Sequence, residues 1–438
     1  MPGRAVDRDP SVEVRGYRRP QPGTQPEYWH RPYASSELRS PRMALVSIPQ
    51  TLTEVTGPHF GATDVAPGAN VLTRRHPGQP LGERIIVGGR VLDEDGRPQP
   101  HTLVEVWQAN AAGRYLHAWD QHDAPLDPNF TGQGAMLTDA DGSYRFVSIR
   151  PGSYPWRNHL NAWRPAHIHF SVFGPAFATR LVTQMYFPGD PLLAVDPIFN
   201  CTADESARQR LIAAFDWQTT IPETALGYRF DLILRGREGT PTESGARVPA
   251  TTSQTVGPFF KLGLEPLERM ELAGVDAPGE RVTVEGRVVD GEGRPVPDAC
   301  LEIWQADATG QYPESGDQTG GDRTDHERGS FRGFGRIPTD GAGHFRFTTI
   351  KPGAVAGPDG VAQAPHLAVS VFMRGLMKRL VTRIYFPNDP RNSQDSVLGL
   401  VPPERRTTLI AGAASDSPGL LRWDVVLQGA NETVFLDC

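Results

Sequence analysis

Hydrophobic and polar positions alternate over short stretches of the chain, which is the pattern of β-strands. Turn-forming clusters such as Asp139–Gly142 separate these stretches. One segment, Asp204–Phe215, begins with acidic residues and is predicted to be the main helix. Five strands are predicted in the first half of the chain, at Ile85–Leu92, Thr102–Trp107, Tyr144–Ile149, His167–Val172 and Tyr228–Leu234. Strands of this length and spacing predict an all-β fold, built as an antiparallel β-sandwich with few short helices.

The same motifs occur twice along the chain, about 200 residues apart. The motif at Val104–Gln108 returns at Leu301–Gln305, and Tyr186–Pro188 returns at Tyr385–Pro387. A single repeat at so long a spacing indicates a duplicated domain and not a solenoid. The sequence therefore predicts two tandem sandwiches with extended N-terminal arms, divided into an arm at 1–80, a domain at 81–237, a linker at 238–251 and a domain at 252–438.

Composition excludes several classes of function. The formal net charge of −7 argues against nucleic acid as a main partner. The three cysteines, Cys201, Cys300 and Cys438, are far apart and odd in number, so no disulfide framework is predicted and a reducing cytoplasm is expected. The start of the sequence has no apolar signal segment, and no long apolar run occurs elsewhere. We therefore expect neither secretion nor membrane insertion.

Four side chains suggest a metal site. His167 and His169 lie two residues apart on a predicted strand, so both point to the same face and could hold one metal ion. A histidine pair on a polar sheet face is the simpler alternative for these two alone. Tyr115 and Tyr154 would add two hard, anionic oxygen donors. Such a set favours ferric iron over zinc.

Three motifs carry a resemblance to a known family. They are Trp107 followed by Tyr115, the segment Arg150–Arg157 around Tyr154, and the segment Trp163–Phe170 around both histidines. Together they resemble the intradiol ring-cleaving dioxygenases, and within them the branch that acts on protocatechuate, whose members consist of two related chains, α and β. Residues 33–237 are similar to a β chain and residues 250–438 to an α chain, so both types occur here in one polypeptide.

The resemblance implies an enzyme that opens protocatechuate with dioxygen to 3-carboxy-cis,cis-muconate. Tyr115, Tyr154, His167 and His169 would bind one ferric ion per chain. The catechol would bind as a dianion and displace Tyr154, which accepts a proton. Arg164 would stabilise the charge that develops on the ring.

The resemblance also implies a composite substrate pocket. Arg157 and Arg374 are the candidates for binding the substrate carboxylate, and Phe259 replaces a tyrosine common in α chains. Core packing is an open alternative for Trp107 and Trp156, as is a simple turn for Gly257-Pro258. The predicted lining is Tyr33, Trp107, Trp156, Arg157, Gln184 and Ile198 from the first half, with Thr255, Gly257, Pro258, Phe259 and Arg374 from the second.

The second copy retains only half of the ligand set. Tyr312 and His366 correspond to Tyr115 and His167, but Val355 and Ala368 replace the other two ligands. This site is therefore predicted to be vacant. Two other functions remain open: an intradiol dioxygenase for catechol or hydroxyquinol, and a non-catalytic β-sandwich binding module. A homo-oligomer of the fused chain is expected.

Overall fold

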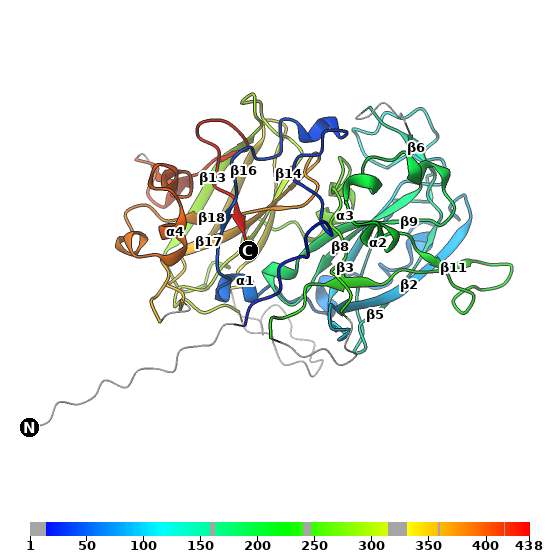
Figure 1. Ribbon diagram of the computed structural model, residues 1–438, viewed down its shortest axis with the longest axis horizontal. Coiled ribbons are helices and arrows are strands. Elements are labelled where there is room, and N and C mark those ends of the chain that lie inside the picture. The colour runs from blue at the N-terminus through cyan, green and yellow to red at the C-terminus, as the bar shows by residue number, and fades with distance from the viewer. Residues whose placement is uncertain (1–14, 158–162, 240–246, 314–330, 358–359, 416) are drawn as a thin grey trace, which may run out of the picture.

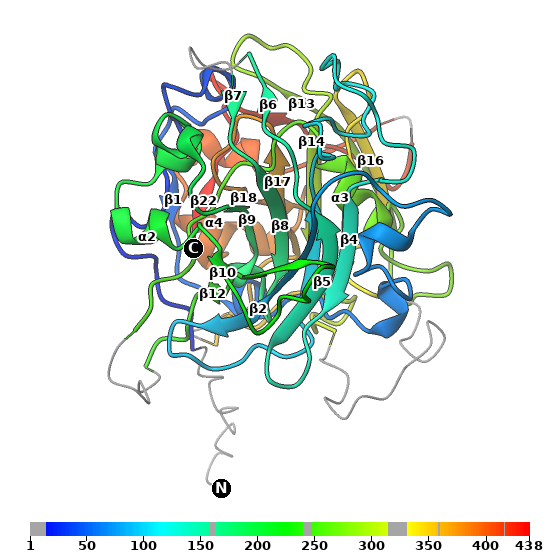
Figure 2. The same ribbon diagram turned by 90° about the vertical axis from the view of Figure 1, so that its right-hand side faces the viewer.

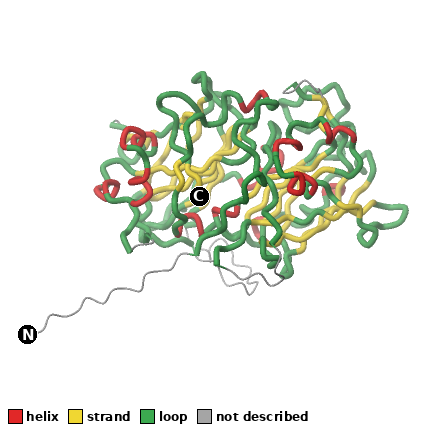
Figure 3. Tube along the Cα trace, viewed as in Figure 1, coloured by secondary structure: helices red, strands yellow, loops and turns green. Residues whose placement is uncertain are grey.

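The computed structural model describes residues 15–157, 163–239, 247–313, 331–357, 360–415 and 417–438. Two β-sandwiches lie side by side along the long axis of the molecule (Figure 1). In Figure 2 the first sandwich faces the viewer and the second lies behind it. Helices are few and short (Figure 3). The prediction of an all-β fold with two sandwiches is confirmed.

The first sandwich consists of a five-stranded and a four-stranded sheet. Its core lies between them and includes Val87, Phe146, Val106, Ile168 and Phe170. The five-stranded sheet has the order β10-β11-β2-β12, with β5 paired to β2, and comprises Ala214–Phe215, Leu226–Arg229, Arg84–Asp93, Leu232–Leu234 and Ser143–Ile149. The four-stranded sheet has the order β4-β3-β8-β9 and comprises Gln133–Leu137, Leu103–Trp107, His167–Phe173 and Leu181–Tyr186. A separate ribbon pairs β6 (Tyr154–Pro155) with β7 (Trp163–Arg164).

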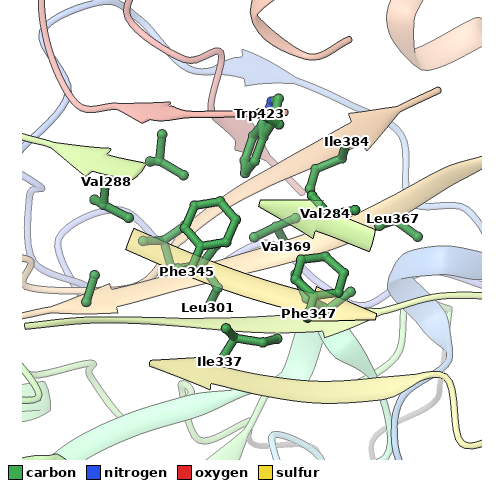
Figure 4. Packing of buried hydrophobic residues seen from close by; sticks show 14 of the residues in the cluster. Val284, Val288, Leu301, Ile337, Phe345, Phe347, Leu367, Val369, Ile384 and Trp423 are labelled. Atoms are coloured by element: carbon green, nitrogen blue, oxygen red, sulfur yellow. The ribbon is translucent and has the colours of Figure 1, made fainter. Parts of the chain in front are cut away.

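The second sandwich repeats this topology. Its core is the cluster shown in Figure 4, with Phe345, Phe347 and Trp423 among aliphatic side chains. One sheet has the order β16-β13-β20-β19, with β21 paired to β13, and comprises His344–Ile350, Arg281–Val289, Leu420–Arg422, Gly412–Ala413 and Val425–Val426. The other has the order β15-β14-β17-β18 and comprises Phe334–Pro338, Ala299–Trp304, His366–Met373 and Leu380–Tyr385.

Three details of the predicted elements are wrong. The sheets are not purely antiparallel, because the returning strands β11 and β12 run parallel to β2, as β20 and β21 do to β13. The predicted strand Tyr228–Leu234 is two strands, β11 and β12. The predicted helix is much shorter: α2 spans Glu205–Gln209, with its first turn capped by the Asp204 carboxylate. Beyond it the backbone hydrogen-bonds to Tyr186 and then forms β10, so sheet pairing ends the helix.

The remaining regular elements are short and mostly lie in connections. The other α-helices are α1 (Leu52–Val55), α3 (Lys261–Leu264) and α4 (Ser396–Leu400). Short 3-10 helices occupy Ala34–Ser36, Ala62–Asp64, Leu72–Arg74, Phe177–Thr179, Pro191–Ala194, Phe199–Cys201, Glu265–Leu267, Pro390–Ser393 and Pro403–Thr408. No helix in the described ranges is long and apolar enough to cross a membrane.

The segment before each sandwich packs on the other sandwich. In the first arm, β1 (Val46–Ser47) pairs with β22 (Leu436–Asp437), and Tyr28 packs against the second core. In the second, Gln254 donates its backbone N–H to Val182 of β9. The crossing arms and the opposite sandwich together bury the outer faces of β3, β8 and β9 in the first domain and of β14, β17 and β18 in the second. The exact domain limits stay a prediction, since residues 240–246 lie outside the described part of the chain.

Candidate active site

Strand β8 places His167 and His169 on the face that points away from the first core. Ile168 and Phe170, which alternate with them, pack inside the sandwich. The two imidazole rings are 4.9 Å apart between centroids. His169 pairs with Trp107 of the neighbouring strand, and their rings stack at 4.8 Å with an interplanar angle of 4°. Trp107 thus fixes the orientation of one predicted ligand.

The two predicted tyrosine ligands reach the histidines from other segments. Tyr154 begins β6, and its hydroxyl lies 3.3 Å from Nε2 of His167. Tyr115 follows β3, with its ring centroid 5.5 Å from that of Tyr154. The Tyr115 hydroxyl is buried and has no hydrogen-bond partner among the described residues. The structure therefore brings all four predicted ligands together around one point.

The protonation states at this point suit metal binding. Nδ1 of His167 lies 2.7 Å from the Pro165 carbonyl oxygen, which assigns the proton to Nδ1 and leaves Nε2 free to ligate. Burial, together with the nearby Arg164 cation, holds the pKa of both histidines well below its ordinary value, so both are neutral. Burial raises the pKa of both tyrosines. A strongly charged cation is therefore needed to hold them as anions, and two imidazoles with two phenolates fit a hard ferric ion.

This ligand set differs from common metal sites. Within the described ranges, no group of three or more His, Cys, Asp or Glu side chains is placed to hold a metal ion. Two of the four donors here are phenols, which lie outside that ligand class. The unpartnered Tyr115 hydroxyl is the atom that such a metal would satisfy.

Arg164 lies next to the four side chains in a fully buried position. Its guanidinium binds Asp196 through two hydrogen bonds of 2.9 and 3.2 Å, and also contacts the side-chain oxygens of Gln184 and Tyr186. Burial alone would lower the pKa of Arg164, but Asp196, with smaller contributions from Tyr186 and Tyr154, outweighs burial and raises the pKa well above its ordinary value. A fixed positive charge thus lies 3.4 Å from Nε2 of His167.

Several predicted pocket residues of the first half gather beside Arg164. The Tyr33 and Trp156 rings are 5.5 Å apart, and the Arg164 guanidinium lies over Trp156 at 5.3 Å. Ile198 is buried in the same cluster as Tyr33. Arg157 is exposed to solvent.

The second arm supplies the opposite side of this region. The Thr255 carbonyl accepts a hydrogen bond of 2.9 Å from Gln184, and the Phe259 ring lies 4.6 Å from the Tyr115 ring. Gly257 has a φ of +70°, and a Cβ there would lie 3.3 Å from the His169 ring. Pro258 follows it, half-buried. The predicted arm residues therefore do come together with the ligands within one chain.

Arg374 lies at the edge of the same region. Its guanidinium is within 3.3 Å of Asp298, which also binds Arg39 of the first arm. The next residue, Gly375, donates its N–H to the Tyr33 hydroxyl at 3.2 Å. The Arg374 side chain remains 36% exposed, so one face of it is open to solvent.

Comparisons with known proteins match both halves of the chain. A family described as Dioxygenase matches residues 55–236 and 257–429, and a family described as Protocatechuate 3,4-dioxygenase beta subunit N terminal matches residues 17–51. The chain belongs to the dioxygenase family. It carries that family's domain twice, and the match at residues 17–51 marks the first half as the β type.

Two curated relatives illustrate the two types. The protocatechuate 3,4-dioxygenase beta chain of Burkholderia cepacia is 59% identical over 222 residues, covering 50% of this chain and 94% of the relative. The alpha chain from the same organism is 41% identical over 201 residues, covering 43% of this chain and 96% of the relative. Catechol 1,2-dioxygenase 2 of Acinetobacter lwoffii is 36% identical over 156 residues, covering 33% of this chain and 54% of the relative. The predicted resemblance to both an α and a β chain is confirmed.

The second dioxygenase domain has a different arrangement at the equivalent position. Thr53 of the first arm lies between two retained residues, because its hydroxyl is 2.8 Å from the Tyr312 hydroxyl and 2.8 Å from Nε2 of His366. Ala368 pairs with Trp304 as His169 pairs with Trp107, and both Val355 and Ala368 are buried. The two ligand losses predicted from the repeat therefore lie where expected, and a threonine hydroxyl satisfies the two residues that remain.

Three residues around Arg164 were missed from the sequence. All three are fully buried. Asp196 and Tyr186 contact the guanidinium directly, and Gln254 contacts the Tyr186 hydroxyl. The internal repeat contained a signal for two of them, since Tyr186 and Asp196 return at the same spacing as Tyr385 and Asp395. A tyrosine or aspartate alone in a loop-rich sequence gives no indication that it will be buried against an arginine.

Proposed function

We propose that this chain is a ferric intradiol dioxygenase that opens protocatechuate with dioxygen to 3-carboxy-cis,cis-muconate. The observation that carries the proposal is the convergence of Tyr115, Tyr154, His167 and His169, with the Tyr115 hydroxyl buried and unpartnered among the described residues. The similarity to both chains of protocatechuate 3,4-dioxygenase supports this substrate over catechol or hydroxyquinol, whose dioxygenases match more weakly.

The four side chains would hold one ferric ion per chain. When bound, the ion would supply the Lewis acid that holds both catechol oxygens and activates the ring towards dioxygen. Tyr154 is the ligand suited to release, because it is 9% exposed whereas Tyr115 is only 1% exposed. Its phenolate would accept a proton from the incoming catechol. His167 and His169 would remain bound, since strand pairing fixes both.

The residues around the ligands would have different roles in substrate binding. Arg164 would place its fixed charge beside the reacting ring, where negative charge develops. Tyr33, Trp156 and Ile198 would form one wall, with Trp107 and Gln184 holding ligands and Arg164 in place. The other wall would be Thr255, Gly257, Pro258 and Phe259, and Arg157 and Arg374 are the cations that would bind the carboxylate.

The second domain would not bind iron. Its Tyr312 and His366 lack the other two ligands, and the Thr53 hydroxyl already lies between them. The role of this domain would be to complete the first site with its arm. We further propose that the fused chain forms a homo-oligomer and works in the cytoplasm, where its three free cysteines stay reduced.

The visible spectrum of the purified protein tests the proposal. Ferric tyrosinate absorbs visible light, whereas a colourless protein would favour a non-catalytic β-sandwich binding module. Anaerobic addition of protocatechuate should shift the band, and air should then convert the substrate to its ring-opened product. Metal analysis should give one iron per chain. Two irons per chain, or loss of the band in His366→Ala, would contradict the assignment to the first domain.

A further inference from the structure

The guanidinium of Arg164 lies in a buried hydrogen-bonded cradle. Asp196 binds it through both carboxylate oxygens, and it lies 2.9 Å from Oε1 of Gln184 and 3.1 Å from the Tyr186 hydroxyl. All three partners are completely buried. Asp196 is the single carboxylate that forms an ion pair with Arg164 among the described residues, so the pair is neutral as a whole. The NH1 group stays on the side of His167, at 3.4 Å.

A residue from the arm of the second domain closes this cradle. Oε1 of Gln254 lies 3.1 Å from the Tyr186 hydroxyl, which itself contacts Arg164. The backbone N–H of Gln254 donates to Val182 of β9 at 3.0 Å, and its side-chain amide contacts the Cys201 sulfur at 3.4 Å. Gln254 is thus fixed in the second layer around Arg164, and it brings no charge.

The second domain has equivalent residues around a buried arginine, but this arginine lies at a different position in the sheet. Val355 is bridged to Gln363 just as Tyr154 pairs with Arg164, so Gln363 stands at the position of Arg164. The arginine is instead Arg383, which occupies on β18 the position of Gln184 on β9. Both side-chain polar atoms of Gln363 are buried without a partner in the described structure.

The arm residue changes together with the arginine. Glu54 of the first arm stands where Gln254 stands in the second, and it binds Arg383 at 2.7 Å. Tyr385 and Asp395 remain, as counterparts of Tyr186 and Asp196. In the vacant domain two buried carboxylates, Glu54 and Asp395, act on Arg383, which forms its ion pair with Glu54. In the ligand-bearing domain Arg164 forms its ion pair with Asp196, and the arm contributes the neutral amide of Gln254.

We propose that Asp196 and Gln254 are positioning residues for Arg164: Asp196 fixes its guanidinium beside the ligands, and the neutral Gln254 keeps a second carboxylate away from it. This inference rests on the proposed function. A second buried carboxylate would offset the field that Arg164 exerts on the substrate oxygens, and would attract the guanidinium away from His167. The arm of the second domain thus tunes the charge at the site of the first.

The test is to replace Gln254 with Glu and with Met in the full-length protein. Gln254→Glu should keep iron content, the visible band and the band shift on anaerobic protocatechuate addition. Its kcat should fall on the order of ten-fold to a hundred-fold, with little change in KM, as expected for weakened transition-state stabilisation. Gln254→Met is neutral and of similar size, so it should retain most of the wild-type kcat.

Two further variants separate positioning from a general structural role. Asp196→Asn should keep the band but lose kcat, because the guanidinium is released from one side. Glu54→Gln makes the reverse change at the equivalent position of the second domain, and should lower stability while leaving kcat unchanged.

The inference is overturned if Gln254→Glu turns over at the wild-type rate, or if Gln254→Met loses as much kcat as Gln254→Glu. Failure of the proposed function has a different signature, namely a wild-type protein with no visible band and no turnover of protocatechuate.

Discussion

At the residue scale, the site combines side chains with opposing requirements. Burial raises the pKa of Tyr115 and Tyr154 and lowers that of His167 and His169. Without a metal the cluster is therefore an uncharged group of phenols and imidazoles beside the Arg164–Asp196 pair. Two neutral nitrogen donors and two phenols that ionise only near a strong cation select for a hard, highly charged ion.

Replacing ligands should remove the colour without unfolding the protein. Tyr154→Phe and His169→Ala each take away one of four donors, so we expect loss of the visible band or of activity. The core on the other face of β8 should keep the fold intact. Iron analysis, the visible spectrum and circular dichroism would measure this. A coloured and fully active Tyr154→Phe protein would contradict the assignment of that ligand.

Replacing Arg164 with Lys should separate the contribution of its positive charge from that of its planar guanidinium. A lysine keeps a positive charge beside Asp196 but loses the planar fork that binds both carboxylate oxygens. We expect iron and colour to remain. The kcat should fall, because transition-state stabilisation decreases by about 2–4 kcal/mol. Steady-state kinetics with the spectrum as control would measure this. Unchanged turnover would show that Arg164 is only a partner for Asp196.

At the scale of elements, the two arms determine which residues cover the outer face of each four-stranded sheet. The second arm places a glycine over His169, and the first arm places Thr53 between Tyr312 and His366. The same sheet face thus carries the four candidate ligands in one domain and is filled by a threonine hydroxyl in the other.

Gly257→Ala should change the metal site in addition to straining the backbone. Gly257 has a φ of +70°, and Gly68 has a φ of +72° with open space around it. Alanine at either position should cost about 1–2 kcal/mol of stability because of the left-handed backbone. Only at position 257 would the new Cβ press on the His169 ring. We therefore expect a shifted visible band and weaker substrate binding in Gly257→Ala alone. Equal spectra for both variants would argue against this contact.

The turn between β17 and β18 carries Arg374, whose neighbour Gly375 hydrogen-bonds the Tyr33 hydroxyl. Arg374→Ala should raise the KM for protocatechuate by roughly ten-fold, the effect of losing one hydrogen bond to a charged group. The KM for catechol, which has no carboxylate, should stay nearly constant. Equal effects on both substrates would show that Arg374 serves mainly to pair with Asp298.

At the scale of the whole molecule, a buried charge network joins the two sandwiches. Arg336 of β15 binds Glu105 of β3 at 2.8 and 3.0 Å, and also binds Glu302. Glu302 in turn binds Arg180 of the first sandwich at 2.8 and 2.9 Å. Burial would raise the pKa of Glu302, but Arg180 and Arg336 outweigh it and lower the pKa. Two carboxylates and two guanidiniums thus balance one another in a buried interface.

Arg336→Leu should strongly destabilise the protein, because it leaves Glu105 buried without its partner. We expect a loss of about 3–5 kcal/mol in the free energy of unfolding. Arg346→Leu is the matched control, since its ion pair with Glu285 is exposed, and it should cost less than about 1 kcal/mol. Urea unfolding would measure both. Equal losses would mean that the network does not hold the sandwiches together.

The sequence by itself determined the all-β fold and the duplication, and it identified the four candidate ligands. These features depend on local pattern: alternation places His167 and His169 on one face of a strand, and a repeat reveals itself by comparison within the chain. It also identified Val355 and Ala368 as losses in the second copy. The histidine pair and the repeat need only residue type and spacing along the chain, whereas the two tyrosines also needed the resemblance of their motifs to a known family.

Only the tertiary structure decided which distant segments complete the site. The crossing of the arms places Gln254 beside Tyr186 and Thr53 beside His366, over separations that no local pattern encodes. The predicted helix Asp204–Phe215 failed for the same reason, because pairing with Tyr186 and β11 overrode its local preference. The buried ion pairs could not be predicted from the sequence either, since an ion pair becomes buried only when two remote surfaces meet and exclude water.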